Sequence, residues 1–463
     1  MTGISIVSEL QAVREALFML LGHPCVLFQL SAGGRVLVTA ASPFALRHSS
    51  VAAFHAILGW YAEKGTKINA IRRFVKSETD FPDQQTFVAA VACKLTILDQ
   101  RLIDLEELVV VGSSGRSDQI VSLLALQGEL EPFLRPFDLL SQIISNLPAD
   151  STTLIASAAL QHIEQLFNAA CALQSTGDNS SFVFIADIFF TCLQTYLRPI
   201  RRWMESGTLH ASSPTFLISK TRSDDEVELA GLWHDQYSLR RDREGALLAP
   251  AFVHTVAERI FITGKSVVFL HRLSKHGIPT LAATTPTSAE RPAAGEQEAG
   301  EITLESAYAE AAPLAPFADV FAAALERWIA ARHHSVSSRL RNILHADCGL
   351  RDSLDALEYI FLCRDGHRFD AFARAMFEKV DRGVVGWNDR FLLTELVQGV
   401  YSGVKCVYAE RLRVRVVEEE EDGKGKGLKE KRRTVKMWKS IELDYAVPLF
   451  PLPLPDPPSK IQR

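Results

Sequence analysis

The sequence lacks the cysteine pattern of a disulfide framework or of a zinc cluster. Its seven cysteines, among 463 residues, are an odd number, lie far apart and never form a CxxC pair. A cysteine among apolar neighbours, such as Cys192, is typical of a small buried side chain in a reducing compartment. We therefore expect a cytoplasmic protein with no metal site and no bound cofactor.

An excess of positive charge is also absent. Fifty Lys and Arg residues stand against fifty-five Asp and Glu residues, which gives a net charge of -5. No global positive field exists to hold the chain on nucleic acid or anionic lipid, so we expect neither partner. The strongest apolar run, residues 182–197, contains Asp187 and is shorter than the ~20 residues that span a bilayer. We therefore expect no membrane-spanning segment.

Complete motifs for catalysis are missing as well. The string TGKS at residues 263–266 resembles the end of a phosphate-binding loop, but Arg259 occupies the position of the first required glycine. The adjacent His333 and His334 point to different faces of a helix, which is a poor arrangement for one metal, and we expect both at the surface. The sequence predicts no enzyme. An enzyme that acts through Lys265 is the third-ranked hypothesis.

Apolar residues recur at helical spacing over most of the chain. This pattern predicts an all-α fold, an elongated stack of antiparallel helical bundles with at most one small β-hairpin near the C-terminus. Besides a helical stretch at residues 13–21, the predicted helices cover residues 84–108, 118–147, 152–173, 182–206, 251–277, 315–344, 350–380 and 388–401.

The helix predicted at residues 182–206 is apolar almost all round. Asp178, Asn179 and Ser180 precede it as candidate N-cap residues and Gly207 is a candidate C-terminal residue, so both of its ends are marked. Its polar residues gather on one narrow stripe that includes Asp187, Thr191, Thr195 and Arg198. We expect a central helix whose charged groups are satisfied at a seam with another helix; a polar functional site is the alternative.

Two other segments have distinct compositions. Residues 280–316 hold six glutamates and one arginine among Ala, Pro, Thr and Gly, which predicts a disordered or mobile linker. Residues 411–417 alternate between polar and apolar side chains, and residues 437–445 are rich in strand formers. These two segments predict a β-hairpin with a charged tip, followed by a proline-rich tail.

Two ordered motifs resemble one protein family. LWHDQYSLR at residues 232–240 is followed by a helix that bears ERIFITGKSVVFL at residues 258–270. Together with a preceding helix that ends in a Trp and Gly turn, they resemble the gamma-tubulin complex component family. The family-signature residues, for which the resemblance implies a structural or interaction role rather than catalysis, are Trp203, Gly207, Leu232, Trp233, Tyr237, Leu239, Arg240, Thr263, Gly264, Lys265 and Ser266.

The resemblance implies a scaffold that lies side by side with other gamma-tubulin complex components and supports microtubule nucleation at a spindle pole body or other microtubule-organising centre. It implies direct gamma-tubulin binding only if the C-terminal domain suffices. Gly264 would permit close helix approach, Thr263 and Ser266 would bond back to the helix backbone, and Lys265 would face solvent or a neighbour. A helical adaptor or tethering subunit of another complex is the alternative function.

The resemblance also divides the chain. Residues 1–279 correspond to the N-terminal helical domain, 280–316 to the acidic linker, 317–445 to the start of the C-terminal domain and 446–463 to the tail. Family members continue for several hundred residues past the segment similar to 443–445, so we expect a C-terminally truncated member. The acidic insertion resembles the noncore components, especially a fungal fifth-component type.

Overall fold

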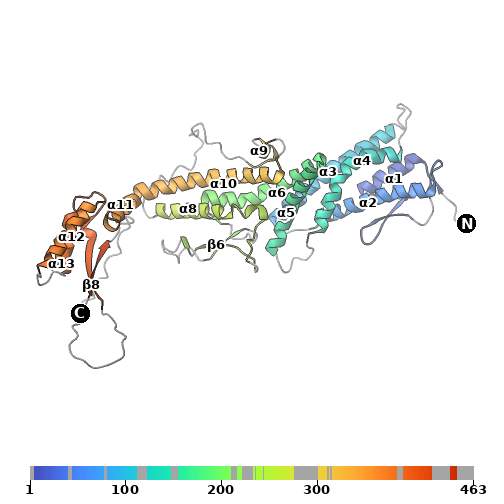
Figure 1. Ribbon diagram of the computed structural model, residues 1–463. Coiled ribbons are helices and arrows are strands. Elements are labelled where there is room, and N and C mark those ends of the chain that lie inside the picture. Colours follow the sequence, from blue (N-terminus) through green and yellow to red (C-terminus); the bar gives the residue numbers. More distant parts are fainter. Residues whose placement is uncertain are drawn as a thin grey trace, which may run out of the picture. The chain divides into compact units, whose positions relative to one another are not determined.

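The computed structural model is mostly helical (Figure 1). It describes residues 5–39, 44–77, 81–111, 122–147, 155–209, 216–221, 233–234, 236–242, 245–275, 301–309, 312, 315–382, 389–419 and 438–445. The chain divides into two compact units, each considered by itself: the first combines residues 1–269 with 288–335, and the second combines 270–287 with 336–463. The predicted tail lies outside the described residues.

The first unit is a bundle of long helices. It contains α1 (Glu9–Leu21), α2 (Val51–Val75), α3 (Pro82–Val111), α4 (Leu123–Ser145), α5 (Ile155–Thr176), α6 (Asn179–Ser206), α9 (Leu304–Tyr308), and most of α8 (Ala257–Lys275) and α10 (Phe317–Asn342). A 3-10 turn, η2 (Ala251–Val253), precedes α8, so the single helix expected at 251–277 begins six residues late.

Side-chain and glycine caps explain where several helices begin and end. Ser8, Ser50 and Ser122 each accept a hydrogen bond from a backbone N–H three residues later, at the starts of α1, α2 and α4. Asp178 caps α6 in the same way, and Gly207 ends it in the left-handed conformation. Both predicted ends of α6 are confirmed.

Helix α6 lies at the centre of the first unit. It packs against α3, α4 and α5, and fourteen of its residues, among them Phe182, Phe189 and Trp203, are buried. Phe189 contacts Phe167, Phe252 and Phe321, which come from three other elements. By length and composition α6 is the one described helix that meets the criteria for crossing a membrane, and most of its apolar window is buried inside the unit. The packing is that of a core helix.

Four two-stranded sheets occur among the described residues. The pairs are β1 (Ser5–Ile6) with β4 (Phe44–Ala45) in parallel, and, antiparallel, β2 (Phe28–Leu30) with β3 (Val36–Val38), β5 (Ile218–Lys220) with β6 (Tyr237–Leu239), and β7 (Leu412–Glu419) with β8 (Trp438–Tyr445). The β-hairpin predicted near the C-terminus, β7–β8, is confirmed. The expectation of at most one β-hairpin is wrong, because other strand pairs are present among the described residues. Strands of two or three residues are too short to show a period of two.

Helix α2 was absent from the predicted helices because two of its core-facing positions hold residues that interrupt an apolar stripe. Lys64 and Gly65 are both buried, between Tyr61 and Ile68. Gly65 has no side chain, and Met19 of α1 fills the space beside it. The Met19 Sδ lies 2.2 Å from where a Cβ on residue 65 would be. The pattern of α2 is therefore completed by a neighbouring helix.

Part of the segment expected to be a mobile linker is packed against the first unit. Ile302 and Ala307 are buried, and Thr303 begins α9 with a capping box. From α6, Gln194 donates to the carbonyl of Ile302 at 2.9 Å, and from α5, Gln174 donates to the hydroxyl of Tyr308 at 3.1 Å. Apolar residues spaced among the glutamates provide these anchors; residues 276–300 lie outside the described part.

The second unit has its own small core. It contains α11 (Leu350–Phe361), α12 (Gly366–Asp381), α13 (Arg390–Tyr401) and the β7–β8 hairpin, with a π-helical turn at Ile343–Asp347 and a 3-10 turn at Ala409–Arg411. The core residues are Ala356, Ile360, Phe372, Leu393, Val397, Tyr401, Val407, Leu412, Val414 and Tyr445. The single helix expected at 350–380 is interrupted because Cys363 adopts a positive φ of 51°.

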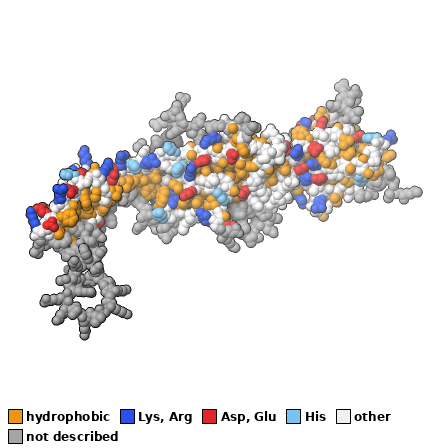
Figure 2. All heavy atoms as spheres, in the orientation of Figure 1, with side chains coloured by type: hydrophobic (Ala, Val, Ile, Leu, Met, Phe, Trp, Pro, Cys, Tyr) orange, Lys and Arg blue, Asp and Glu red, His pale blue; other side chains and the backbone are white. Residues whose placement is uncertain are grey.

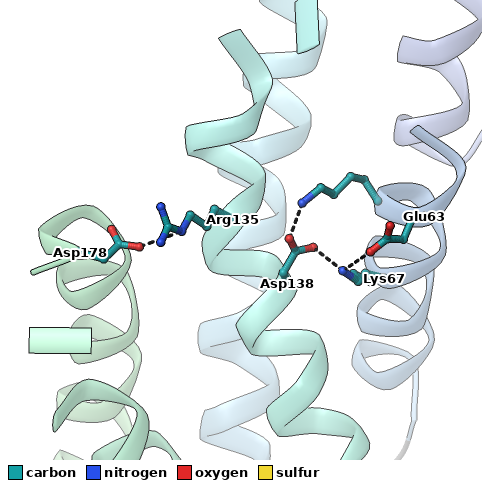
Figure 3. A network of polar contacts seen from close by, with 6 residues as sticks. Glu63, Lys67, Arg135, Asp138 and Asp178 are labelled. Carbon is teal, nitrogen blue, oxygen red and sulfur yellow. Dashed lines mark hydrogen bonds and ion pairs between the residues drawn. The ribbon is translucent and has the colours of Figure 1, made fainter. Parts of the chain in front are cut away.

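A charged network joins α2 to α4 (Figure 3). Asp138 of α4 accepts hydrogen bonds from both Lys64 and Lys67 of α2, and Lys67 also pairs with Glu63 at 2.7 Å. The Lys64 side chain is 10% exposed, and its amine also lies 5.3 Å from the centre of the Trp60 ring. Asp138 is therefore the carboxylate that neutralises the buried lysine of α2.

We expect Asp138→Asn to lower the free energy of unfolding by about 2 kcal/mol, because it leaves the buried Lys64 charge without its carboxylate. Urea unfolding of the full chain measures this. Glu63→Gln is the matched control; its side chain is 62% exposed, so we expect a change below ~1 kcal/mol. Equal effects of the two substitutions would contradict this account.

Candidate functional site

The family-signature residues meet where the end of α6, strand β6 and helix α8 pack together in the first unit (Figure 1). Leu232 lies outside the described residues; the other ten are described. They form a packed junction: most are buried, and their contacts are with one another and with neighbouring helices.

Trp203 is the centre of this junction. Its indole is fully buried and donates a hydrogen bond to the carbonyl of Ile260 in α8, at 3.1 Å. The ring lies over Gly264, where an added Cβ would be 2.0 Å from ring atom Cε2. Tyr237 of β6 contacts the ring edge to face, with centroids 5.0 Å apart. A glycine is therefore required for the indole to reach the backbone of α8.

A second close approach occurs one turn along α8. Gly207, with a φ of 65°, lies against Val268, and a Cβ there would be 2.6 Å from Val268 Cγ2. The chain then leads to strand β5, which pairs with β6 so that Ile218 faces Leu239. Arg240 donates its backbone N–H to the carbonyl of Leu217 at 2.8 Å, which extends this pairing by one residue.

Lys265 is buried in the junction, which differs from the expectation that it faces solvent or a neighbour. Its amine lies 4.7 Å from the ring centres of both Trp233 and Phe261. Burial lowers the pKa of this amine below its ordinary value of 10.5. Trp233 also contacts Phe269 edge to face. Lys265 thus holds the Trp233 segment against α8 through its charge and its stem.

The two hydroxyls of the TGKS string bond to the helix that carries them. Thr263 donates to the carbonyl of Arg259 at 2.6 Å, and Ser266 donates to that of Ile262 at 2.9 Å. All four residues lie inside α8, whose backbone N–H groups are used within the helix. A phosphate loop needs such groups free and converging, so this string cannot cradle phosphates.

His333 joins α10 to the same helix. Its Nδ1 lies 2.9 Å from the hydroxyl of Thr263, and the residue is half-buried rather than fully exposed; His334 is exposed, as expected. Burial, and then the charges of Arg259 and His334, lower the pKa of His333 below its ordinary value. Nothing in the sequence near His333 marks this contact, because its partner is seventy residues away.

The polar stripe of α6 is a seam with α3. Asp187 pairs with Lys94 at 2.5 Å, and Thr195 lies 3.1 Å from Thr86, both hydroxyls in hydrogen-bond range. Thr191 donates to the carbonyl of Asp187 instead. The seam, which was the favoured expectation, is found for Asp187 and Thr195. Arg198 is exposed and forms no ion pair among the described residues, so the seam does not satisfy it. Within the described ranges, no group of three or more His, Cys, Asp or Glu side chains is placed to hold a metal ion.

Comparison with known proteins gives an independent view of these residues. A family model described as gamma tubulin complex component N-terminal matches residues 13–346, which include all the signature residues. The chain is 26% identical over 206 residues to human gamma-tubulin complex component 3, and 30% identical over 148 residues to its Xenopus laevis homolog. The alignments cover 44% and 31% of this chain, but only 20% and 15% of those relatives.

We expect Gly264→Ala to destabilise the first unit by about 2–3 kcal/mol, because the added methyl overlaps the indole of Trp203. Thermal unfolding of the full chain measures the change. Gly59→Ala is the matched control: Gly59 is also inside a helix, is exposed and has nothing within 4 Å of the added Cβ. That variant should be unchanged or more stable by up to ~1 kcal/mol. Similar losses in both would refute the packing role.

We expect His333 to lower the free energy of unfolding at acidic pH. Since its folded pKa lies below 6.5, the unfolded chain binds a proton that the folded chain does not, and the free energy of unfolding decreases as pH falls through 6.5. We expect His333→Gln to flatten the profile between about pH 7 and pH 5, measured by chemical unfolding. His334→Gln, which changes the exposed neighbouring residue, is the control, and we expect it to keep most of the dependence of the free energy of unfolding on pH. An unchanged slope in His333→Gln would contradict the assignment.

Proposed function

The chain belongs to the gamma-tubulin complex component family, and from this premise we propose that it is a non-catalytic scaffold subunit of a gamma-tubulin complex. In this role it assembles side by side with sibling components and supports microtubule nucleation at a microtubule-organising centre. The observation that carries the proposal is the family match over residues 13–346, which covers most of the chain and the whole signature junction.

The helices of the first unit offer the kind of surface that lateral assembly requires. Helix α3 buries one face in the core and exposes Ile97 and Leu108, each 60% accessible, about three turns apart. Phe133 of α4 is also exposed and lies beside α3, with the guanidinium of Arg101 5.4 Å from its ring centre. On the face that Figure 2 shows, hydrophobic side chains are mixed with charged ones over the described part of the first unit. We assign the α3–α4 face to contact with a sibling component.

Several finer points remain part of the proposal. Direct gamma-tubulin binding is included only as far as residues 317–445 suffice for it, and location at a spindle pole body is proposed together with the scaffold role. The noncore, fifth-component subtype stays a prediction, since the two relatives named above are both component 3 proteins. The predicted domain limits also stay predictions.

Affinity capture of the tagged full chain from cells tests the scaffold role. We expect sibling gamma-tubulin complex components in the captured material, with gamma-tubulin present through them or directly. A chain that stays monomeric and retains neither would overturn the proposal. Capture of an unrelated multiprotein complex instead would favour the adaptor or tethering alternative.

The lateral face gives a sharper prediction. We expect the double substitution Ile97→Asp and Leu108→Asp to reduce capture of sibling components at least ~10-fold, because charges placed on an apolar contact are desolvated on assembly. Circular dichroism should show unchanged helix content, since both side chains are exposed. Leu37→Asp, at a side chain 54% exposed on β3, is the control. Full capture by the double variant would remove the α3–α4 face from the proposal.

A further inference from the structure

The last turns of α6 carry a row of arginines on one face. Arg198, Arg201 and Arg202 are followed by Glu205, and positions spaced by three, four and seven residues lie along one side of a helix. Arg198 and Arg202 are exposed and Arg201 is half-buried. Within the described part of the chain, none of these three arginines forms an ion pair.

Helix α10 adds a fourth arginine to this row. The guanidinium of Arg332 lies 4.1 Å from the ring centre of Trp328, and that of Arg201 lies 5.9 Å from the same ring. Arg332 also pairs with Glu205 at 3.2 Å and is itself only 14% exposed. The buried indole therefore fixes two guanidinium groups in place between α6 and α10.

Among the described residues Arg198, Arg201 and Arg202 form no ion pair, so the row holds more positive charge there than Glu205 neutralises. Glu326 of α10 is engaged by Arg259 of α8 at 2.6 Å. Burial lowers the pKa of Arg332, the carboxylate of Glu205 opposes this shift, and the like charge of Arg201 adds a smaller lowering. An anion supplied from outside would relieve this repulsion.

We propose that the row formed by Arg198, Arg201, Arg202 and Arg332 binds an acidic segment of a partner polypeptide. This surface is separate from the α3–α4 face, and the inference does not depend on the proposed scaffold role. The exposed guanidinium groups of Arg198 and Arg202 can each receive a carboxylate in a two-pronged geometry, while Arg201 and Arg332 lie against Trp328 and add positive charge beside them.

The spacing of the arginines favours the carboxylates of a polypeptide as the ligand. Arg198 and Arg202 are about 6 Å apart along the helix axis, and alternate side chains of an extended chain recur at about 6.6 Å. Glu205 limits the row at one end, so the acidic residues of the partner align with Arg198 and Arg202 and end before Glu205. A nucleic acid would instead need a longer basic track with exposed aromatic rings for its bases, and Trp328 is buried.

Fluorescence anisotropy with the full chain tests the proposal. The probe is a labelled peptide of about ten residues in which Glu alternates with Ser, at about 0.15 M salt. We expect saturable binding, at least ~10-fold weaker for the double substitution Arg198→Gln and Arg202→Gln. Glu205→Gln, which removes the opposing carboxylate, should bind the probe more tightly than the unsubstituted chain.

The control is a second pair of exposed arginines in the same unit, Arg35 and Arg47, changed together to Gln. It removes the same charge far from the row along the sequence, so we expect less than a twofold change. No saturable binding by the unsubstituted chain, or equal losses in both double variants, would overturn the proposal. Tighter binding of a single-stranded oligonucleotide through Arg198 and Arg202 would overturn the assignment to a polypeptide.

Discussion

The close approach of Trp203 to Gly264 fixes how the end of α6 packs on α8 in the first unit. Trp203 reaches the backbone of α8 only because Gly264 has no Cβ, and its hydrogen bond to Ile260 needs that approach. Tyr237 then packs on the indole and brings β6 to the same place. The separation of α6 and α8 is therefore set by the thickness of an aromatic ring, and the signature residues surround that constraint.

The sequence predicted well those elements that bury a continuous apolar face of their own. Helices α3, α6 and α10 were found for that reason. Helix α2 was missed because Lys64 and Gly65 occupy core positions, and their partners Asp138 and Met19 come from other helices. The strands of two or three residues were not predicted because they are too short to show an alternating pattern. A local sequence pattern cannot show that a lysine or a glycine belongs in the core when its partner there comes from a distant part of the chain.

The residues of the candidate site also divide into those that the sequence marked and those whose contacts only the packing of helices reveals. Two motifs marked Trp203 and the TGKS string, but their contact with each other depends on the packing of two helices. Lys265 was expected to face solvent or a neighbour, and His333 was expected at the surface. The structure buries Lys265 against aromatic rings and half-buries His333 beside the Thr263 hydroxyl. Burial of a polar side chain is decided by neighbours that one sequence does not reveal.

Residues 301–309 return the chain to the first unit through small, specific anchors, above all Ile302 and the capped start of α9. The nearest buried residues on either side of 276–300 are Leu273 and Ile302. When a chain segment is held at both ends, each doubling of its length changes closure entropy by only about 0.6 kcal/mol. Evolution can lengthen, shorten or recode that stretch at small thermodynamic cost, so related chains should diverge there in size while keeping the anchors.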